Sequence, residues 1–267
     1  MQDQMAERSS PGDMLRFVQS VEYPWFPGAI FPSEMAFFLF QCEVAGVDCL
    51  IESGRQDGYS TAVIAAYAQA KRIHAASIDV ERDPARAAAC RERLRWFTNL
   101  ELVVGNTFTE LPSLLNSQKQ RIALLIDGPK RHEAIYLSAA AAALGPIRLV
   151  AHHSGTPETD WYPHFAYRFP NPRYLEDSAL PQSAAFEAFR RWEEALVGQP
   201  IAHSGLVLSV LPQPGPSPRY LSGPSPRRTL SAMVWYWWWK LGCPGGGSFL
   251  TFRGSIGRVA YAFGYGR

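Results

Sequence analysis

The fold is decided by residues 49–70, which read CLIESGRQDGYSTAVIAAYAQA. They begin with a short apolar run at 49–51, turn at the glycines of 54–58, and continue as an alanine-rich segment at 60–70. An apolar run before a glycine turn is typical of a buried strand, and an alanine-rich segment is typical of a helix that packs closely on a sheet. The stretch therefore predicts one strand–turn–helix unit of an α/β fold.

The same unit is repeated along the chain. A second strand lies within 73–80 and ends at Asp79, and Asp83-Pro84 then supplies an N-cap with proline at the first helical position of 85–97. The run at 122–126 is apolar throughout, as a central parallel strand should be. Further strands are predicted at 100–104, 147–151 and 206–211, and further helices at 35–47, 132–143 and 184–197.

Strands that alternate with helices of ten or more residues predict a parallel sheet with helices on both faces. We expect an α/β, Rossmann-like, doubly wound domain over residues 30–211, with a mostly parallel seven-stranded sheet. An N-terminal arm, 1–29, would pack onto this domain. A basic extension rich in proline, glycine and tryptophan, 212–267, would follow it, with poor order as one expectation for that segment.

The charge of the chain is unevenly distributed. The 267 residues carry a net charge of +2, and 47% of them are hydrophobic, which excludes a wholly disordered chain and a uniformly basic nucleic-acid binder. From position 212 onward there are seven Lys or Arg and no Asp or Glu, so residues 1–211 carry −5. An acidic domain and a basic tail therefore share this chain.

Cysteines and hydropathy favour a cytoplasmic protein. The four cysteines have no CxxC spacing, so neither a zinc site nor a disulfide framework is indicated. The first thirteen residues are polar and mixed in charge, unlike a secretory signal, and no apolar run is long enough to cross a bilayer.

Polar residues end five consecutive predicted strands. In chain order they are Glu52, Asp79, Gly105-Asn106, Asp127-Gly128 and His152-His153. Turn preference explains glycine and asparagine at such points, but it does not explain acids after three of the strands. Because the carboxyl ends of parallel strands meet at one edge, where ligands bind in such sheets, we expect a ligand site there.

The first two strand ends have the chemistry of nucleotide binding. Glycines in the turn let a ligand approach the backbone closely, and an acid at the end of the second strand can accept hydrogen bonds from ribose hydroxyls. The glycine spacing is G-x-x-x-G with an acid two residues ahead, not G-x-G-x-x-G. This spacing favours a cationic or amine-bearing ligand over a dinucleotide.

With these residues in place, the sequence resembles class I S-adenosylmethionine-dependent methyltransferases. Residues 52–61 are similar to their E-x-G-x-x-x-G-[YF]-S-T motif, 77–80 to their second motif, 105–106 to the third-strand position, and 125–128 to the fourth. The similarity is greatest to the small-molecule O-methyltransferase-like group and covers about 28–211.

The resemblance implies a role for each of these residues. Gly54 and Gly58 would admit the methionine part of S-adenosylmethionine, with Glu52 near its ammonium group and Asp127 facing the reacting centre. The remaining cofactor-binding residues would be Tyr59, Ser60, Asp79 at the ribose and Asn106 at the adenine. Two positions depart from the pattern: Gln56 replaces a glycine, and the usual His-Asp pair after strand five is His152-His153.

The activity that follows is in-line transfer of a methyl group from S-adenosylmethionine to a hydroxyl of a small-molecule acceptor. A base must then remove the hydroxyl proton, and the candidates are His153 and His152, with His132 as a third. A divalent metal at Asp127 is left open but not favoured. The alternatives are a non-catalytic methyltransferase-like binding module, or another Rossmann-like enzyme that uses a nucleotide.

The acceptor is not specified by the sequence. Tyr23, Trp25 and Phe26, together with residues 161–164, could line its pocket, although core packing explains them equally well. Lys130 and Arg131 could attract an anionic acceptor, and a solvated loop is the simpler interpretation. The sequence is also compatible with a homodimer and with contact between the tryptophan-rich tail and nucleic acid or a membrane surface.

Overall fold

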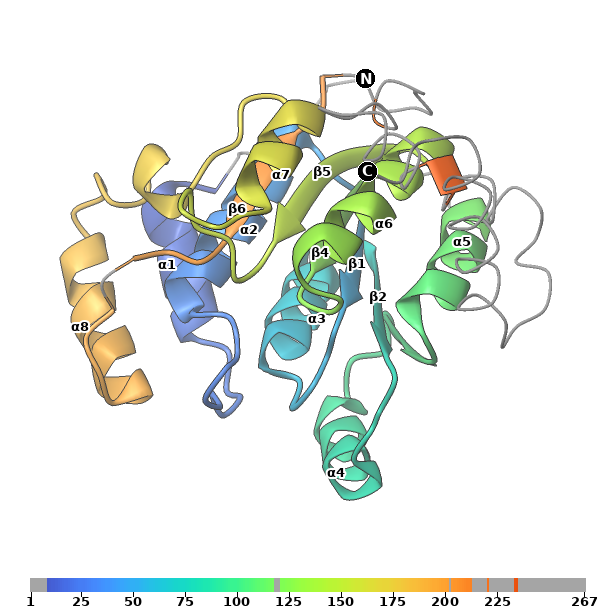
Figure 1. The fold of residues 1–267 in the computed structure, drawn as a ribbon. Coiled ribbons are helices and arrows are strands. Elements are labelled where there is room, and N and C mark those ends of the chain that lie inside the picture. The colour runs from blue at the N-terminus through green and yellow to red at the C-terminus, as the bar shows by residue number, and fades with distance from the viewer. Residues whose placement is uncertain (1–8, 118–120, 202, 213–219, 221–232, 235–267) are drawn as a thin grey trace, which may run out of the picture.

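The structure is a computed structural model that describes residues 9–117, 121–201, 203–212, 220 and 233–234. Figure 1 shows its helices and strands along the chain. In chain order they are α1 (Pro11–Gln19), α2 (Pro32–Ala45), β1 (Cys49–Ser53), α3 (Tyr59–Lys71), β2 (His74–Asp79), α4 (Pro84–Leu94), β3 (Leu100–Val104), α5 (Thr107–Ser117), β4 (Ile122–Ile126), α6 (Arg131–Leu144), β5 (Ile147–His152), α7 (Tyr162–Arg168), the 3₁₀ turn η1 (Leu175–Asp177), α8 (Phe186–Val197) and β6 (Val207–Val210).

The strands form one sheet in the order β3-β2-β1-β4-β5-β6. The first five strands are parallel, and β6 is antiparallel to β5. The chain order reverses between β1 and β4, and ligands bind at such a switch point in doubly wound sheets. The topology therefore confirms an α/β, Rossmann-like, mostly parallel sheet and places its switch point beside residues 53 and 127.

Helices cover both faces of the sheet. Apolar side chains of α1, α2, α3 and α8 form one core with one face, and those of α5, α6 and α7 form the other core with the opposite face. Figure 1 shows α1 and α8 on the left and α5 on the right, with the sheet between them. Every residue of β1 and β4 is buried, as expected for central parallel strands.

The helix ends follow from local sequence. Asp83 caps α4 by accepting hydrogen bonds from the backbone amides of Ala85 and Arg86, and Pro84 occupies the first turn. Helix α2 also begins with proline, and the Glu34 carboxylate accepts a hydrogen bond from the Phe31 amide one turn back. This capping contact brings the buried Glu34 to the amino end of α2.

The prediction of seven strands is wrong for the described residues, which form six. The segment between β5 and β6 contains α7, η1 and α8. On the open edge of β6 the pairing is reduced to one bridge between Arg173 and Leu208. Asn171, at the next position that would bond to β6, has φ +50°, so the chain leaves the extended conformation there and the bridge does not continue into a strand.

Residues at both ends of the expected domain contribute to its core. Within the predicted arm, α1 buries Met14, Leu15 and Val18. Within the predicted extension, Tyr220 is 1% exposed and its ring lies 6.0 Å from that of Phe169. The rest of the extension lies outside the described residues, apart from positions 212, 233 and 234.

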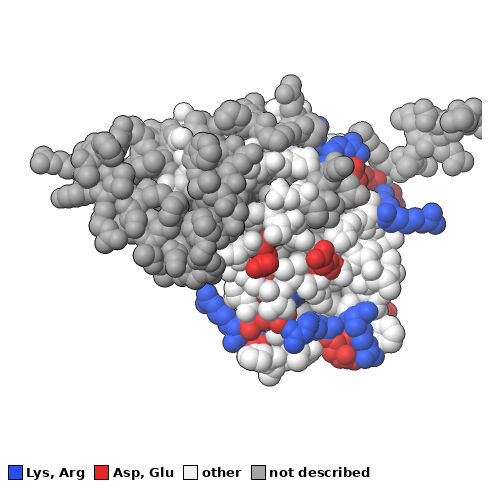
Figure 2. All heavy atoms as spheres, turned by 90° about the vertical axis from the view of Figure 1, so that its right-hand side faces the viewer, with Lys and Arg blue, Asp and Glu red and all other residues white. Residues whose placement is uncertain are grey.

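Charged side chains gather around α4. Figure 2 shows them at the lower end of the right-hand face, and Figure 1 places α4 at the lower end of the molecule. Glu81 pairs there with Arg55 and Arg91, and Asp57 pairs with Arg86. None of the helices in the described part of the chain is long and apolar enough to span a membrane.

Candidate functional site

Glu52 forms a buried anchor beneath the glycine turn. It is 0% exposed and accepts hydrogen bonds from the hydroxyls of Ser60, Thr61 and Ser77, with the Ser77 contact at 2.7 Å. Burial raises the pKa of its carboxyl, and the three hydroxyls oppose that shift. The sequence predicts Glu52 beside a cofactor ammonium group. In the structure its carboxylate is surrounded by these three hydroxyls, and it links β1 to α3 and β2.

The two glycines of the turn are required by protein contacts. Gly54 has φ +94°, and a β-carbon there would lie 2.6 Å from the Gly128 nitrogen. Gly58 has φ +92°, and a β-carbon there would lie 2.7 Å from the Tyr23 hydroxyl. Both glycines therefore permit a positive φ and a close approach of neighbouring chain.

The turn is held by the acid that ends β2. Asp79 accepts hydrogen bonds from the backbone amides of Arg55 at 2.8 Å and Gln56 at 3.0 Å through one oxygen, and from Glu81 at 2.6 Å through the other. Gln56, which stands where the resembled motif has glycine, adopts φ +49° in the left-handed region. The hydrogen bond to Asp79 thus stabilises a left-handed backbone conformation that is sterically unfavourable for Gln56 and would be free of strain for glycine.

Tyr59, Asn106 and Ser60, the other predicted cofactor-binding residues, lie in three different environments. Tyr59 is 3% exposed, and its hydroxyl has no hydrogen-bond partner among the described residues. The Asn106 side chain accepts a hydrogen bond from the Phe108 amide and so caps the start of α5. Ser60 has both a structural contact and a place at the site: its hydroxyl donates a hydrogen bond to Glu52, and the residue lines the space beside Asp127.

Two spaces at the carboxyl edge bear on whether S-adenosylmethionine fits. A cavity of about 260 Å³ adjoins Asp79, Gln56 and Arg86, so the end of β2 has room for a ribose beside a carboxylate. The space between the glycine turn and Asp127 is about 10 Å³, and Phe26 and Ala29 help to close it. That is about the volume of one water molecule, so the chain has room beside Asp79 for the nucleoside half of the cofactor and little room beside Asp127 for its methionine half.

His152 does not lie with the other candidates. Its side chain is buried among Trp161, Phe165 and Phe169, and its Nε2 lies 2.7 Å from the Ser138 hydroxyl. Burial lowers the pKa of His152 to about 3, so the ring is neutral. The expectation that His152 serves as a base does not agree with this placement, because successive strand residues point to opposite faces and His152 points into the core.

His153 and Asp127 meet where β4 and β5 end. The His153 amide donates a hydrogen bond to the Ile126 carbonyl at 3.0 Å, which extends the pairing of the two strands by one residue. His153 Nδ1 then lies 2.7 Å from Asp127 Oδ1. Lys130 contacts the same Asp127 oxygen and reaches the Ser154 hydroxyl at 3.2 Å.

The Asp127 carboxylate is kept ionised by this contact. Burial alone would raise its pKa, but the hydrogen bond and charge of His153, together with Lys130, lower the pKa below its usual value. An ionised carboxylate paired with an imidazole is a common arrangement for moving a proton.

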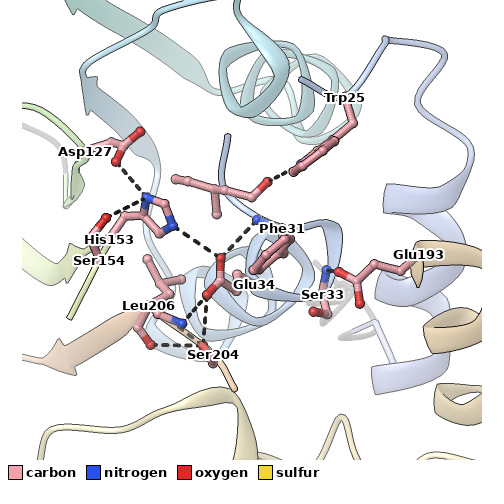
Figure 3. A network of polar contacts seen from close by, with 12 residues as sticks. Trp25, Phe31, Ser33, Glu34, Asp127, His153, Ser154, Glu193, Ser204 and Leu206 are labelled. Atoms are coloured by element: carbon pink, nitrogen blue, oxygen red, sulfur yellow. Dashed lines mark hydrogen bonds and ion pairs between the residues drawn. The ribbon is translucent and has the colours of Figure 1, made fainter. Parts of the chain in front are cut away.

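Glu34 faces the other side of the His153 ring. Figure 3 shows His153 between Asp127 and Glu34, with Glu34 Oε2 3.6 Å from His153 Nε2. Sequence reasoning missed this residue, because a glutamate at the third position of a helix is the ordinary sign of a cap. Glu34 does cap α2, and it also lies within the polar network of the site.

A cavity of about 530 Å³ adjoins His153. Besides His153, its walls are formed by Lys130, Arg131, Ser154, Thr159, Asp160 and Trp161. Of the residues expected to line an acceptor pocket, Trp161 is placed here and Phe26 closes the small space beside Asp127.

The other expected acceptor residues have roles in packing. Tyr23 donates a hydrogen bond to the Asp57 carbonyl, and Trp25 donates one to the Ile30 carbonyl. The Tyr162 ring lies 5.9 Å from that of Tyr174. His132, the third candidate base, lies 4.8 Å from the His164 ring, measured between ring centroids.

The described part of the chain contains no cluster of side chains arranged to bind a metal ion. No group of three or more His, Cys, Asp or Glu residues is placed there to hold an ion. Asp127 is instead in contact with two cationic side chains, Lys130 and His153 when protonated.

Comparison with solved structures finds methyltransferases of loosely similar shape. An O-methyltransferase from Bacillus cereus in complex with SAH has a TM-score of 0.43 and 13% identity, with 78% of this chain and 94% of that chain covered. An SAH-bound methyltransferase from Podospora anserina has a TM-score of 0.41 and 11% identity, covering 75% and 87%. At such scores the similarity does not by itself establish an activity.

The O-methyltransferase TomG from Streptomyces achromogenes, in complex with SAM, has a TM-score of 0.42 and 15% identity, covering 78% and 92%. No protein-family model matches the chain. No curated protein matches it either.

Proposed function

We propose that this chain is an S-adenosylmethionine-dependent methyltransferase that transfers a methyl group to a hydroxyl of a small-molecule acceptor. The order of the motifs in the sequence supports the cofactor. The observation that carries the chemistry is the Asp127–His153 pair, 2.7 Å apart, at the carboxyl edge of the sheet and beside a cavity of about 530 Å³.

The nucleoside would be held at the end of β2. The Asp79 carboxylate accepts hydrogen bonds from three backbone amides, whereas its two oxygens can accept about four. Asp79 therefore has capacity left for a ribose hydroxyl in the adjoining cavity of about 260 Å³. The cofactor, when bound, supplies an electrophilic methyl group on a sulfonium.

The residues at the ends of β4 and β5 would act on the acceptor. Methyl transfer is an in-line displacement, so the protein chiefly aligns the acceptor oxygen with the methyl group. The hydroxyl proton must leave as the new bond forms, and the Asp127–His153 pair would receive it, as the 2.7 Å contact between the two side chains supports. Trp161 and Lys130 line the cavity where the acceptor would lie.

Transfer of an isotopically labelled methyl group tests this proposal. The chain would be incubated with labelled S-adenosylmethionine and a panel of hydroxylated small molecules, and the acceptor-dependent product would be measured. Asp127→Asn should lower kcat about 100-fold or more, because general base catalysis contributes about 10²–10⁴-fold. Asp48→Asn is the matched control, since Asp48 pairs with Arg121 just before the amino end of β1, opposite the edge of the sheet where Asp127 lies.

Product from the wild-type chain and equal turnover in Asp127→Asn would overturn the assignment of Asp127. Absence of product together with absence of SAH binding would instead favour the non-catalytic binding module. A cytoplasmic location, a homodimer and contacts of the tail remain predictions from the sequence.

A further inference from the structure

Glu34 is the polar residue of the site that no sequence motif accounts for. Its side chain is 0% exposed, and it lies on α2, outside the strand ends that supply the other candidates. Its Oε1 accepts hydrogen bonds from the Gly205 amide at 2.5 Å and the Ser204 hydroxyl at 3.2 Å, and Oε2 accepts one from the Phe31 amide at 2.9 Å.

These three contacts fix the position of the carboxylate and favour its ionised form. Two of the donors are backbone amides, which can only donate, so each oxygen must present a lone pair. A buried carboxylate that receives several such bonds is held as an acceptor with its charge. Glu34 is therefore a fixed negative group, and its Oε2 lies 3.6 Å from His153 Nε2.

The opposite nitrogen of the ring faces a second carboxylate. His153 Nδ1 lies 2.7 Å from Asp127 Oδ1, as Figure 3 shows. A bare ring nitrogen that faces a carboxylate oxygen brings two lone pairs together, whereas an N–H makes a favourable contact. Each nitrogen of His153 therefore faces a group that favours a hydrogen on it.

We propose that Glu34 is a positioning residue that holds His153 with a hydrogen on both ring nitrogens, so that the imidazolium is fixed against Asp127 and Asp127 is the group that accepts the proton. The assignment of Asp127 rests on the proposed function. The hold of Glu34 on His153 does not, because it is a property of the free chain.

Lys130 is the charged group near the ring that opposes a positive charge on it. Lys130 contacts Asp127 itself, and Arg131 and Asp160 line the neighbouring cavity with opposite charges. Ser154 lies 3.5 Å from His153 Nδ1 and is neutral. Each ring nitrogen nevertheless faces a carboxylate oxygen, at 3.6 Å for Nε2 and at 2.7 Å for Nδ1.

Nitrogen NMR of the histidine side chain tests the proposal in the free protein. At neutral pH the wild-type chain should show a hydrogen on both Nδ1 and Nε2 of His153. Glu34→Gln should lose the hydrogen on Nε2 and keep the one on Nδ1, because the charge that faces Nε2 is removed. Glu193→Gln is the matched control, since Glu193 is also 0% exposed and binds the amide of Ser33 on the same helix.

A bare Nε2 in the wild-type chain would overturn the proposal, as would an unchanged Nε2–H in a folded Glu34→Gln chain. If Glu34→Gln does not fold, the wild-type spectrum alone decides. The result is distinct from a failure of the proposed function, which would appear as absence of SAH binding while the His153 signals stay as expected.

Discussion

Gln56 shows how one residue can keep the geometry of a glycine at a cost. Its φ of +49° lies in the left-handed region, which costs a residue with a side chain about 1–2 kcal/mol. The amide of Gln56 is held there by its hydrogen bond to Asp79. The turn therefore retains a glycine-like backbone although the sequence motif has lost the glycine.

Gln56→Gly should raise the free energy of unfolding by up to about 1 kcal/mol, because glycine adopts this φ without steric cost. Gln69→Gly is the matched control, since Gln69 is an exposed residue inside α3. There the same change should lower stability by about 1 kcal/mol. Urea unfolding of both variants measures the difference, and equal losses at the two positions would show that Gln56 is not strained.

The buried His152 gives the fold a specific dependence on acid. Burial lowers its pKa to about 3 in the folded chain, whereas the unfolded chain has a value near 6.5. Below pH 6.5 the unfolded chain binds the proton first, so the stability that the neutral ring contributes at neutral pH is lost as pH falls. From pH 6.5 to pH 5 the loss is about 2 kcal/mol.

His152→Leu removes the titrating ring and should therefore lose about 2 kcal/mol less stability than the wild-type chain over this pH range. Denaturant unfolding at pH 7 and pH 5 measures it. Parallel losses in the two chains would show that folding does not lower the pKa of His152.

At the scale of single residues, the sequence predicts which side chains meet when they follow neighbouring parallel strands. Asp127 and His153 follow two neighbouring strands, so the parallel order alone places them together. It did not separate His153 from His152, because side chains alternate along a strand and the sequence does not show which face of β5 meets Phe165 of α7. Glu34 could not be recognised, since its tertiary partners Ser204 and Gly205 lie about 170 residues away in the chain.

At the scale of elements, the sequence predicts the six strands and the helices α2, α3, α4, α6 and α8, but not α1, α5 or α7. The apolar runs of β1 and β4 and the capped start of α4 carry strong local signals. Helix α5 contains Pro112, which reads as a break, and α7 has only seven residues. Helix α1 was read as part of an arm because its neighbours in sequence are polar.

The segment before α2 contributes to the wall of the space beside Asp127. Phe26 and Ala29 line that space of about 10 Å³, and the Arg93 guanidinium lies 5.5 Å from the centre of the Phe26 ring. If the cofactor needs this segment displaced, its apparent affinity is reduced by the fraction of molecules that are closed.

Phe26→Ala should therefore strengthen SAH binding several-fold, as measured by calorimetry. Phe186→Ala is the matched control, because Phe186 also lies beside an arginine, Arg190 at 5.8 Å, but on α8. It should leave the affinity unchanged. Weaker binding by Phe26→Ala would contradict closure and would indicate that Phe26 contacts the cofactor.

At the scale of the whole molecule, the parallel sheet explains why distant segments share one edge. Residues 52, 79, 127 and 153 end four neighbouring strands, and the reversal between β1 and β4 sets the glycine turn beside Asp127. A seventh strand is not found among the described residues, where the pairing on the open edge of β6 is the Arg173–Leu208 bridge, and Asn171 beside it has φ +50°. The basic extension meets this domain at Tyr220.

The most direct test of the central claim is calorimetric titration of the full chain with SAH. The account predicts one binding site in the wild-type chain and a loss of affinity of about ten-fold or more in Asp79→Ala, because hydrogen bonds to a charged group contribute about 1.5–3 kcal/mol. Asp48→Ala should bind as the wild-type chain does. A folded wild-type chain that shows no binding at millimolar SAH would contradict the account.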